Sequence, residues 1–182
     1  MIFESTPLAG LVVLEPRVFG DERGFFLESW NATTFRDAGL DVNFVQDNHS
    51  RSAQGILRGL HYQTEQPQGK LVRVTSGAVF DVAVDLRRSS PTLGQWYGLE
   101  LSAANHRMLW VPPGFAHGFY VLSEFADFQY KCSDYYHPAS EVSLAWDDPT
   151  LSIDWPVPEG DSPRLSAKDA AGQAWGSIPL FD

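Results

Sequence analysis

The sequence predicts a mostly β domain with a sandwich or barrel architecture. Three observations support this fold class: short runs in which apolar and polar residues alternate, turn-forming residues between those runs, and very little helical periodicity. The 15 Gly and 12 Pro are spread along the chain and do not gather in a linker. We find no internal repeat or low-complexity tract, so residues 1–182 are predicted to form a single domain, long enough to bury a substantial core.

Alternation with a period of two identifies the strands, because successive side chains of a strand point to opposite faces. The clearest case is the run 79–86, in which Phe80, Val82 and Val84 share one face and Asp81, Ala83 and Asp85 share the other. Comparable runs predict strands at 71–75, 96–102, 108–111, 118–122, 125–132 and 142–146. Pro, Gly, Ser and Asp clusters separate these runs, as turns require.

Only two short helices are expected. Asn31 can cap a helix over residues 32–38, and Gly39 can end it. A second short helix is expected at 167–171, in a Pro-rich polar tail that begins at Ser152.

The composition excludes several classes of protein. Thirteen Lys and Arg against 23 Asp and Glu give a net charge of −10, which argues against general binding to nucleic acid or to anionic membranes. The uncharged apolar run at 8–14 is far shorter than the ~20 residues of a membrane-spanning helix. A single cysteine, Cys132, excludes an internal disulfide, and no basic residue precedes Arg17 to form a secretory signal. We therefore expect a cytoplasmic protein.

Polar residues within the strands suggest a pocket. Asp81 lies between apolar neighbours, so its face is either the solvent side of a sandwich or the lining of a wet barrel interior. Two histidines, His61 and His117, stand among small and apolar residues, which favours the second interpretation. The pattern Pro112-x-Gly114-x-x-His117 resembles the second motif of the cupin superfamily of small β-barrels. The first cupin motif would place a second histidine near His61, and none is present, so no metal is expected.

Longer strings resemble one family over nearly the whole chain, the dTDP-4-dehydrorhamnose 3,5-epimerases. The strings that carry the resemblance are DERGFFLE (21–28), GILRGLHYQ (55–63), QGKLV (68–72), DVAVDLR (81–87), PGFAHGF (113–119), YKC (130–132) and LSAKD (165–169). The resemblance implies a cupin-type jelly-roll barrel, a homodimer, no metal and no redox cofactor. It also implies a substrate, dTDP-4-dehydro-6-deoxy-D-glucose, and a product, dTDP-4-dehydro-L-rhamnose, on the route to dTDP-L-rhamnose for cell-surface polysaccharide such as lipopolysaccharide.

The residues can supply the chemistry that this family needs. Inverting a carbon beside a ketone requires a base, an acid across the ring and a cation or donor at the developing oxyanion. His61 is the predicted base, Tyr130 the acid, and Lys70 the oxyanion stabiliser, with Asp81 as a possible partner of Lys70. By resemblance, Asp169 orients His61. Without the resemblance, Tyr130 would be interpreted as a core residue, Lys70 as a strand-end lysine and Asp169 as a surface acid.

The remaining site residues are predicted substrate contacts. Guanidinium and ammonium groups suit phosphate oxygens, and aromatic faces suit thymine. By resemblance, Arg23, Arg58 and Lys168 contact the nucleotide and His117 is a substrate ligand. Glu28, Gln46, Asn48 and Glu141 are predicted to bind the base or sugar hydroxyls, and Phe25 and Tyr135 to stack on thymine. In the family, the segment that carries Arg23 and Glu28 can come from the partner subunit.

Three other functions remain open on the sequence. An epimerase that inverts only C3 or only C5 of a related dTDP-4-keto sugar could share the base and the acid. A metal-dependent cupin enzyme, such as a dioxygenase, would need a metal for activity. A non-catalytic sugar-nucleotide binder would have no need of His61 and Tyr130.

Overall fold

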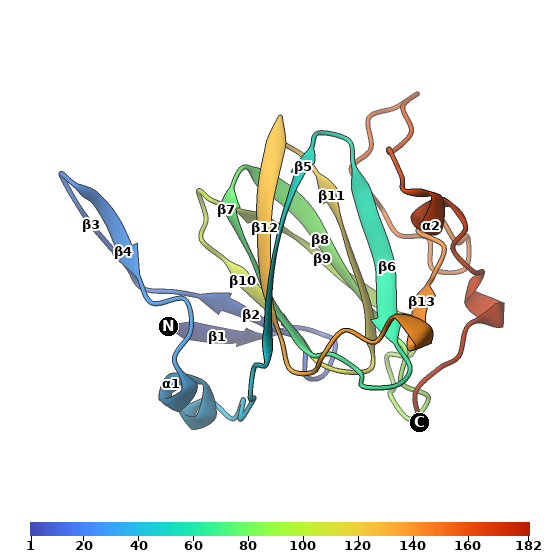
Figure 1. Ribbon diagram of the computed structural model, residues 1–182, viewed down its shortest axis with the longest axis horizontal. Helices are drawn as coiled ribbons and strands as arrows, with labels where there is room; N and C mark the ends of the chain where they lie inside the picture. Colours follow the sequence, from blue (N-terminus) through green and yellow to red (C-terminus); the bar gives the residue numbers. More distant parts are fainter.

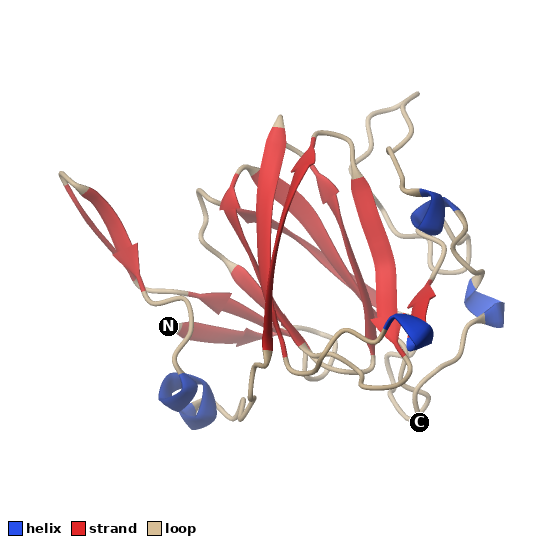
Figure 2. Cartoon of the chain, in the orientation of Figure 1, coloured by secondary structure: helices blue, strands red, loops and turns tan.

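The computed structural model describes residues 1–182 and consists mainly of antiparallel strands with two short α-helices (Figures 1 and 2). The first sheet runs in the order β1 (Ile2–Ser5), β2 (Val12–Glu15), β10 (Met108–Val111), β7 (Lys70–Ser76), β12 (Phe125–Cys132), β5 (Gln46–Ala53). The second runs β13 (Glu141–Ser143), β6 (Leu57–Gln63), β11 (Phe115–Val121), β8 (Ala78–Asp85), β9 (Trp96–Ser102). The predicted all-β jelly-roll architecture is confirmed.

A two-stranded hairpin stands apart from both sheets. It consists of β3 (Val18–Asp21) and β4 (Gly24–Leu27), paired only with each other. In Figure 1 it projects away from the barrel as an arm. Phe25 and Phe26 in this arm are 64% and 69% exposed, so most of their surface is not covered by their own chain.

Most of the strands predicted by alternation are present, but the N-terminal ones were missed. The expected strand at 142–146 ends at Ser143, and Leu144 forms only an isolated bridge to Gln173. Strand β5 was not predicted because its inward face is polar: Gln46, Asn48 and Ser50 face a cavity and not the core. Alternation of apolar with polar residues therefore does not appear in it.

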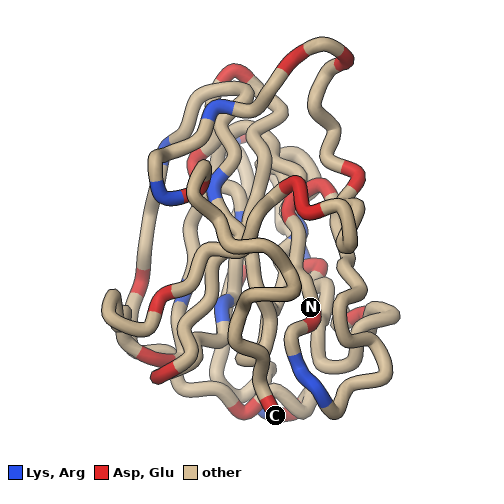
Figure 3. Tube along the Cα trace, turned by 90° about the vertical axis from the view of Figure 1, so that its right-hand side faces the viewer, with Lys and Arg blue, Asp and Glu red and all other residues tan.

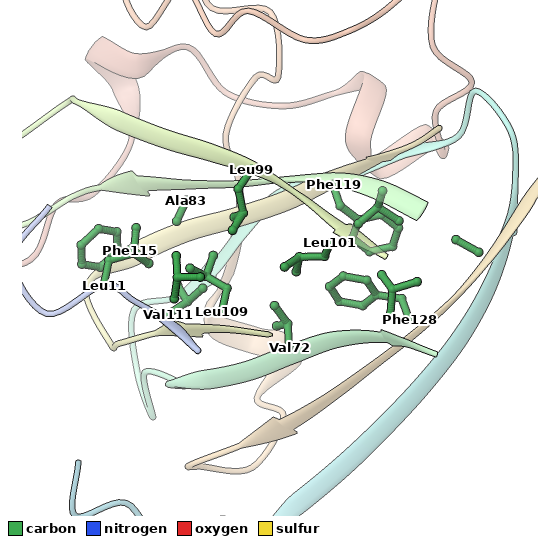
Figure 4. Packing of buried hydrophobic residues seen from close by; sticks show 14 of the residues in the cluster. Leu11, Val72, Ala83, Leu99, Leu101, Leu109, Val111, Phe115, Phe119 and Phe128 are labelled. Carbon is green, nitrogen blue, oxygen red and sulfur yellow. The ribbon is translucent and has the colours of Figure 1, made fainter. Parts of the chain in front are cut away.

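The core lies between the two sheets, as Figure 4 shows for Val72, Leu101 and Phe119 among others. The structure decides the position of Asp81, which is fully buried, so the interpretation of its face as solvent-facing is wrong. The neighbouring Ala83 packs in the core between the sheets, while Val82 packs on the outer face beneath the C-terminal segment. Because both faces of β8 are covered, alternation alone could not identify which face is wet.

Strands β6 and β11 approach each other unusually closely. A Cβ atom on Gly118 would lie 2.6 Å from the carbonyl oxygen of Arg58, and one on Gly59 would lie 2.6 Å from the Cα of Gly118. The pairing register shifts at this point, between His117 and Phe119. Glycine at both positions therefore lets the two backbones meet where the two cavity histidines are carried.

The helices form close to their predicted positions. Helix α1 (Ala32–Asp37) begins after Asn31, whose side chain accepts hydrogen bonds from the backbone N–H of Thr33 and Thr34. Helix α2 (Ala167–Ala170) is capped by Ser166. Two 3-10 turns occur at Pro138–Ser140 and Trp175–Ser177. None of the helices is long and apolar enough to span a bilayer.

The charge distribution follows the acidic composition. Asp and Glu are scattered over the loops at both ends of the molecule (Figure 3). Basic side chains nevertheless occur within the cavity described below, where Arg58, Lys70 and Lys168 are among the lining residues. A local basic pocket thus exists on an acidic protein.

Candidate active site

A cavity of about 630 Å³ lies on the β5 and β6 side of the barrel, lined by six strands and by the C-terminal segment 164–169. It brings together many of the residues singled out in the sequence. Those that line it are Gln46, Asn48, Arg58, His61, Lys70, His117, Tyr130, Glu141, Lys168 and Asp169.

The strand register places the reactive side chains on two facing walls. His61 of β6 pairs directly with His117 of β11, so both imidazoles lie on the same face of the second sheet. Lys70 of β7 pairs with Cys132 of β12, and Tyr130 follows two residues away on the same face of the first sheet. The predicted base and the predicted acid therefore approach the cavity from opposite sheets.

Asp169 holds His61. The Nε2 atom of His61 lies 2.5 Å from Oδ1 of Asp169, a carboxylate that is only 4% exposed. Burial acts to raise the pKa of Asp169, but hydrogen bonds from His61 and Ser166 outweigh it and lower the pKa to about 2. Because an ionised carboxylate only accepts hydrogen bonds, Nε2 carries the proton in the neutral imidazole, and Nδ1 then has a free lone pair.

The opposite wall carries an acid and a cation. Burial raises the pKa of Tyr130, so its phenol is protonated at neutral pH and can donate. Burial lowers the pKa of the Lys70 ammonium group. The expected ion pair of Lys70 with Asp81 is not formed, because Nε2 of His117 occupies both oxygens of Asp81, at 2.9 and 3.0 Å.

His117 and Asp81 form a second, more deeply buried pair behind the cavity. His117 is 8% exposed at its side chain and lines the cavity, whereas Asp81 is fully buried and does not. Asp81 therefore contributes by fixing the imidazole of His117 from behind.

An acidic side chain organises the rim. Glu141 accepts a hydrogen bond from Nζ of Lys168 at 2.8 Å and another from the hydroxyl of Tyr136 at 2.9 Å. Burial acts to raise the pKa of Glu141, but these two partners outweigh it and the pKa is lowered. Another lining residue, the exposed Arg58, donates from its Nε to Ser52 at 2.9 Å, which fixes the direction of the guanidinium group.

Five predicted site residues do not line this chain's cavity, and one of them, Asp81, lies behind it against His117. Arg23, Phe25 and Glu28 belong to the projecting arm or directly follow it, and Tyr135 is 61% exposed outside the lining. Phe25 packs instead on the ring of His106, at 4.7 Å between centroids.

Several lining residues were missed, including Gln68, Tyr136, Arg164 and Ser166. Tyr136 lies next to the predicted Tyr135. Both residues are in a loop, where no alternating pattern indicates which of the two side chains faces the cavity. The Ser-x-x-Asp spacing of Ser166 and Asp169 is a helix-capping signal that could have indicated Ser166. Nothing in the sequence pattern distinguishes Arg164.

Cavity histidines in β-barrels often bind metals, so the donor set matters. No group of three or more His, Cys, Asp or Glu side chains is gathered so that it could hold a metal ion. His61 and His117 each use Nε2 to bind a carboxylate. The arrangement is suited to proton transfer, with a base, an acid and a cation around one space.

Comparisons with known proteins agree with this geometry. Residues 5–176 match the family model described as dTDP-4-dehydrorhamnose 3,5-epimerase. The enzyme of that name from Pseudomonas aeruginosa is 60% identical over 172 residues, 94% of each chain. A dTDP-6-deoxy-D-glucose-3,5-epimerase from Legionella pneumophila, solved with dTDP-4-keto-L-rhamnose, is 54% identical with a TM-score of 0.95, over 99% of this chain and 97% of that one.

A relative with a narrower activity is more distant. A 3'-monoepimerase from Streptomyces bikiniensis, solved with dTDP-quinovose, is 34% identical with a TM-score of 0.88, over 94% of this chain and 86% of that one. The matches cover the full barrel and the segment that carries Asp169, and they confirm the resemblance noted in the sequence. The chain therefore belongs to the dTDP-4-dehydrorhamnose 3,5-epimerase family.

Proposed function

We propose that this isomerase inverts C3 and C5 of dTDP-4-dehydro-6-deoxy-D-glucose and so forms dTDP-4-dehydro-L-rhamnose for dTDP-L-rhamnose biosynthesis. The observation that carries the proposal is the placement of His61 and Tyr130 on facing sheets around one cavity. Inversion needs proton removal on one face of a carbon and proton delivery on the other, which this placement provides.

The first step belongs to His61. Its Nδ1 lone pair accepts the proton from a carbon next to the C4 ketone. The electron pair of the broken C–H bond forms a double bond to C4, and the carbonyl π pair moves onto the ketone oxygen to give an enolate. The positive charge that results on the imidazole is balanced by Asp169, 2.5 Å from Nε2. The negative charge on the ketone oxygen is stabilised by the Lys70 ammonium group in a site where burial strengthens charge interactions.

The second step belongs to Tyr130. Its hydroxyl gives a proton to the opposite face of the enolate carbon. The phenolate then regains a proton from solvent and the His61 imidazolium releases one, so that both groups are reset for the next inversion. A pKa raised by burial keeps the phenol protonated before the step and makes the phenolate a short-lived species. No redox cofactor is required, because proton removal and proton return leave the oxidation state of the sugar unchanged.

Substrate recognition uses both ends of the cavity. Arg58 and Lys168 are suited to the pyrophosphate, and Gln46, Asn48 and Glu141 to polar groups of the sugar or base. His117, held by Asp81, contributes a further polar contact.

The remaining predicted contacts support a homodimer. The arm that carries Arg23 and Phe25 projects from its own barrel with large apolar side chains exposed. In a dimer, this arm would reach the partner's cavity, where Arg23, Phe25 and Glu28 would contact the nucleotide. We infer that each site is completed by the other subunit.

The single cysteine, Cys132, is buried and forms no disulfide, which supports a cytoplasmic location. The −10 net charge supports a small-molecule substrate and no nucleic-acid partner. We propose that the rhamnose product serves cell-surface polysaccharide, including lipopolysaccharide.

The alternative is inversion of a single centre. The monoepimerase relative has the same fold, at 34% identity against 54–60% for the two enzymes named as 3,5-epimerases. The base, the acid and the cation would serve either reaction, so these groups do not separate the two activities. The higher sequence identity to the 3,5-epimerases favours the double inversion.

Incubation with the 4-keto sugar nucleotide in D₂O, followed by NMR, tests the proposal. Deuterium should enter at both C3 and C5, and the product should have the L-rhamno configuration. Deuterium at one carbon only, with one inverted centre, would establish the monoepimerase alternative. Loss of activity with a chelator and its return with iron would establish a metal-dependent enzyme, and binding without exchange would establish a non-catalytic binder.

A further inference from the structure

We propose that Ser166 is a positioning residue for the reaction, and that its hydroxyl holds the Asp169 carboxylate in the orientation that His61 requires. The inference rests on the proposed function, because it assigns a role within the proton-transfer machinery. It concerns an exposed residue that lines the cavity from the C-terminal segment.

The hydroxyl of Ser166 makes two hydrogen bonds to the same residue. It donates to Oδ2 of Asp169 at 2.7 Å and accepts from the backbone N–H of Asp169 at 3.1 Å. The other carboxylate oxygen, Oδ1, accepts from His61 at 2.5 Å and from the backbone N–H of Gly59 at 3.4 Å. Ser166 is thus the only donor to Oδ2, and it fixes the carboxylate on the side away from the imidazole.

The segment that carries Asp169 makes such an anchor necessary. Backbone hydrogen bonds hold the chain before it, at Arg164 to Gly55 and Leu57, and after it, at Gln173 to Ser143 and Ala145. Between these ties lies only the four-residue helix α2, too short to be stable by itself. Asp169 therefore lies in a connecting segment between two backbone attachments and not in a strand of a sheet.

The second histidine pair in the cavity shows what a strand-borne carboxylate does. Asp81 lies in the middle of β8 and holds Nε2 of His117 with both oxygens, at 2.9 and 3.0 Å. Asp169 holds His61 with one oxygen only and leaves the other to Ser166. The serine thus supplies for Asp169 the fixation that the strand gives Asp81.

Loss of the hydroxyl would leave a nearly buried carboxylate oxygen without a donor. An unsatisfied buried acceptor is costly, so the side chain would turn toward solvent or toward another donor. Either movement lengthens the hydrogen bond between Asp169 and His61. The tautomer and the orientation of the imidazole are then no longer fixed. Substrate contacts at Arg58 and Lys168 do not depend on this hydrogen bond.

The test compares three substitutions at Ser166 in the full-length enzyme. Ser166→Ala and Ser166→Gly both remove the hydroxyl, but glycine caps a helix nearly as well as serine does. Ser166→Thr keeps a hydroxyl in the same place. We expect kcat to fall about tenfold or more for both Ala and Gly, as for loss of a hydrogen bond to a charged group, with KM unchanged and Thr close to wild type.

Ser162→Ala is the matched control. Ser162 lies in the same C-terminal segment, is exposed, makes no side-chain hydrogen bond and does not line the cavity. Its kinetics should equal those of the wild-type enzyme. C5 deuterium exchange should fall in parallel with kcat in Ser166→Ala, since orientation of the base governs the first step.

The outcomes separate two kinds of failure. Wild-type-like kcat in both Ser166→Ala and Ser166→Gly would overturn the inference and leave the proposed epimerase intact. A kcat that is low in Ser166→Ala but normal in Ser166→Gly would show that Ser166 acts only by capping the helix, and this result would also overturn the inference. Absence of C3 and C5 exchange in the wild-type enzyme would overturn the proposed function itself.

Discussion

One hydrogen bond decides which nitrogen of His61 is available for the proposed role of base. Because Asp169 is ionised and accepts a hydrogen bond from Nε2, only Nδ1 of the neutral imidazole is free to accept a proton from carbon. The sequence pattern indicates His61 as the base, but only the position of Asp169 at Nε2 identifies Nδ1 as the free nitrogen. The same reasoning applies to His117, whose Nε2 is held by Asp81.

His61→Asn is therefore expected to abolish C5 deuterium exchange, because asparagine cannot accept the proton. Removal of a general base typically costs ~10²–10⁴-fold in rate. Nucleotide binding should persist, which calorimetry with dTDP can measure. Exchange at a wild-type rate would remove His61 from the base role.

Tyr130→Phe is expected to separate exchange from inversion. The variant keeps His61 and the enolate, so deuterium still enters from the face of the base, while delivery on the opposite face is lost. NMR in D₂O should show epimerised product falling more than initial exchange. Epimerisation equal to that of the wild type would remove Tyr130 from the mechanism.

The pairing of β6 with β11 shows how strand packing sets the site. Gly59 and Gly118 allow the two backbones to meet, and His61 and His117 lie directly opposite each other beside this contact. Strand β5 shows the opposite case: its cavity face is polar, so its sequence carries no strand-like alternation although it pairs fully with β12. Because the cavity requires polar residues on β5, this strand cannot be recognised from the alternation of apolar and polar residues.

Gly118→Ala is expected to destabilise the barrel and to reduce activity together. The new methyl would meet the Arg58 carbonyl at 2.6 Å, and backbone on both strands would have to shift. Overpacking of this kind typically costs about 1–3 kcal/mol. Gly176→Ala is the control, since nothing lies within 4 Å of its Cβ position. Urea unfolding should show a loss for the first variant only, and an equal stability for both would contradict the packing argument.

The projecting arm makes the proposed dimer testable by complementation. Arg23→Ala and His61→Asn should each be weak or inactive alone. A mixed dimer contains one site with an intact His61 and an intact partner Arg23, so mixing the two variants under exchange of subunits should restore activity. Mixtures that stay inactive would place Arg23 and His61 in the same chain's site.

Acid should destabilise the folded protein through its buried carboxylates. Burial acts to raise the pKa of Asp85, but hydrogen bonds from Arg87, Ser90 and Thr92 outweigh it and lower the pKa from 3.8 to about 2. The unfolded chain therefore binds protons first as pH falls, so this stabilisation is complete above about pH 4 and is lost toward pH 2. The hydrogen bonds and ion pair with Arg51 lower the pKa of Asp127 to about 2 as well.

Asp85→Asn provides the measurement. Urea unfolding followed by tryptophan fluorescence gives the free energy of unfolding of the wild type and the variant. The difference between the two should be largest above pH 4 and should become smaller toward pH 2. Asp85 lies outside the cavity lining, so the comparison reports on stability alone. A difference that is constant with pH would contradict the assigned ionisation.

The order of residues along the chain was sufficient for the all-β class, most of the central strands, both helices and the cavity residues that lie within recognisable strings. These are local properties: alternation, caps and short motifs depend on neighbours a few positions apart. The burial of Asp81 and the pairing of Lys70 with Cys132 across strands were not accessible from it.

Long-range packing decided those features, because they depend on which faces are covered and which backbones meet. His61 and Asp169 are 108 residues apart, and only the closed barrel brings them to 2.5 Å. Likewise, Arg23 and Phe25 match their motif in sequence, yet the fold carries them away from their own cavity. Motif strings can name the reacting groups, but distance and direction come from the packing of segments that the chain itself keeps far apart.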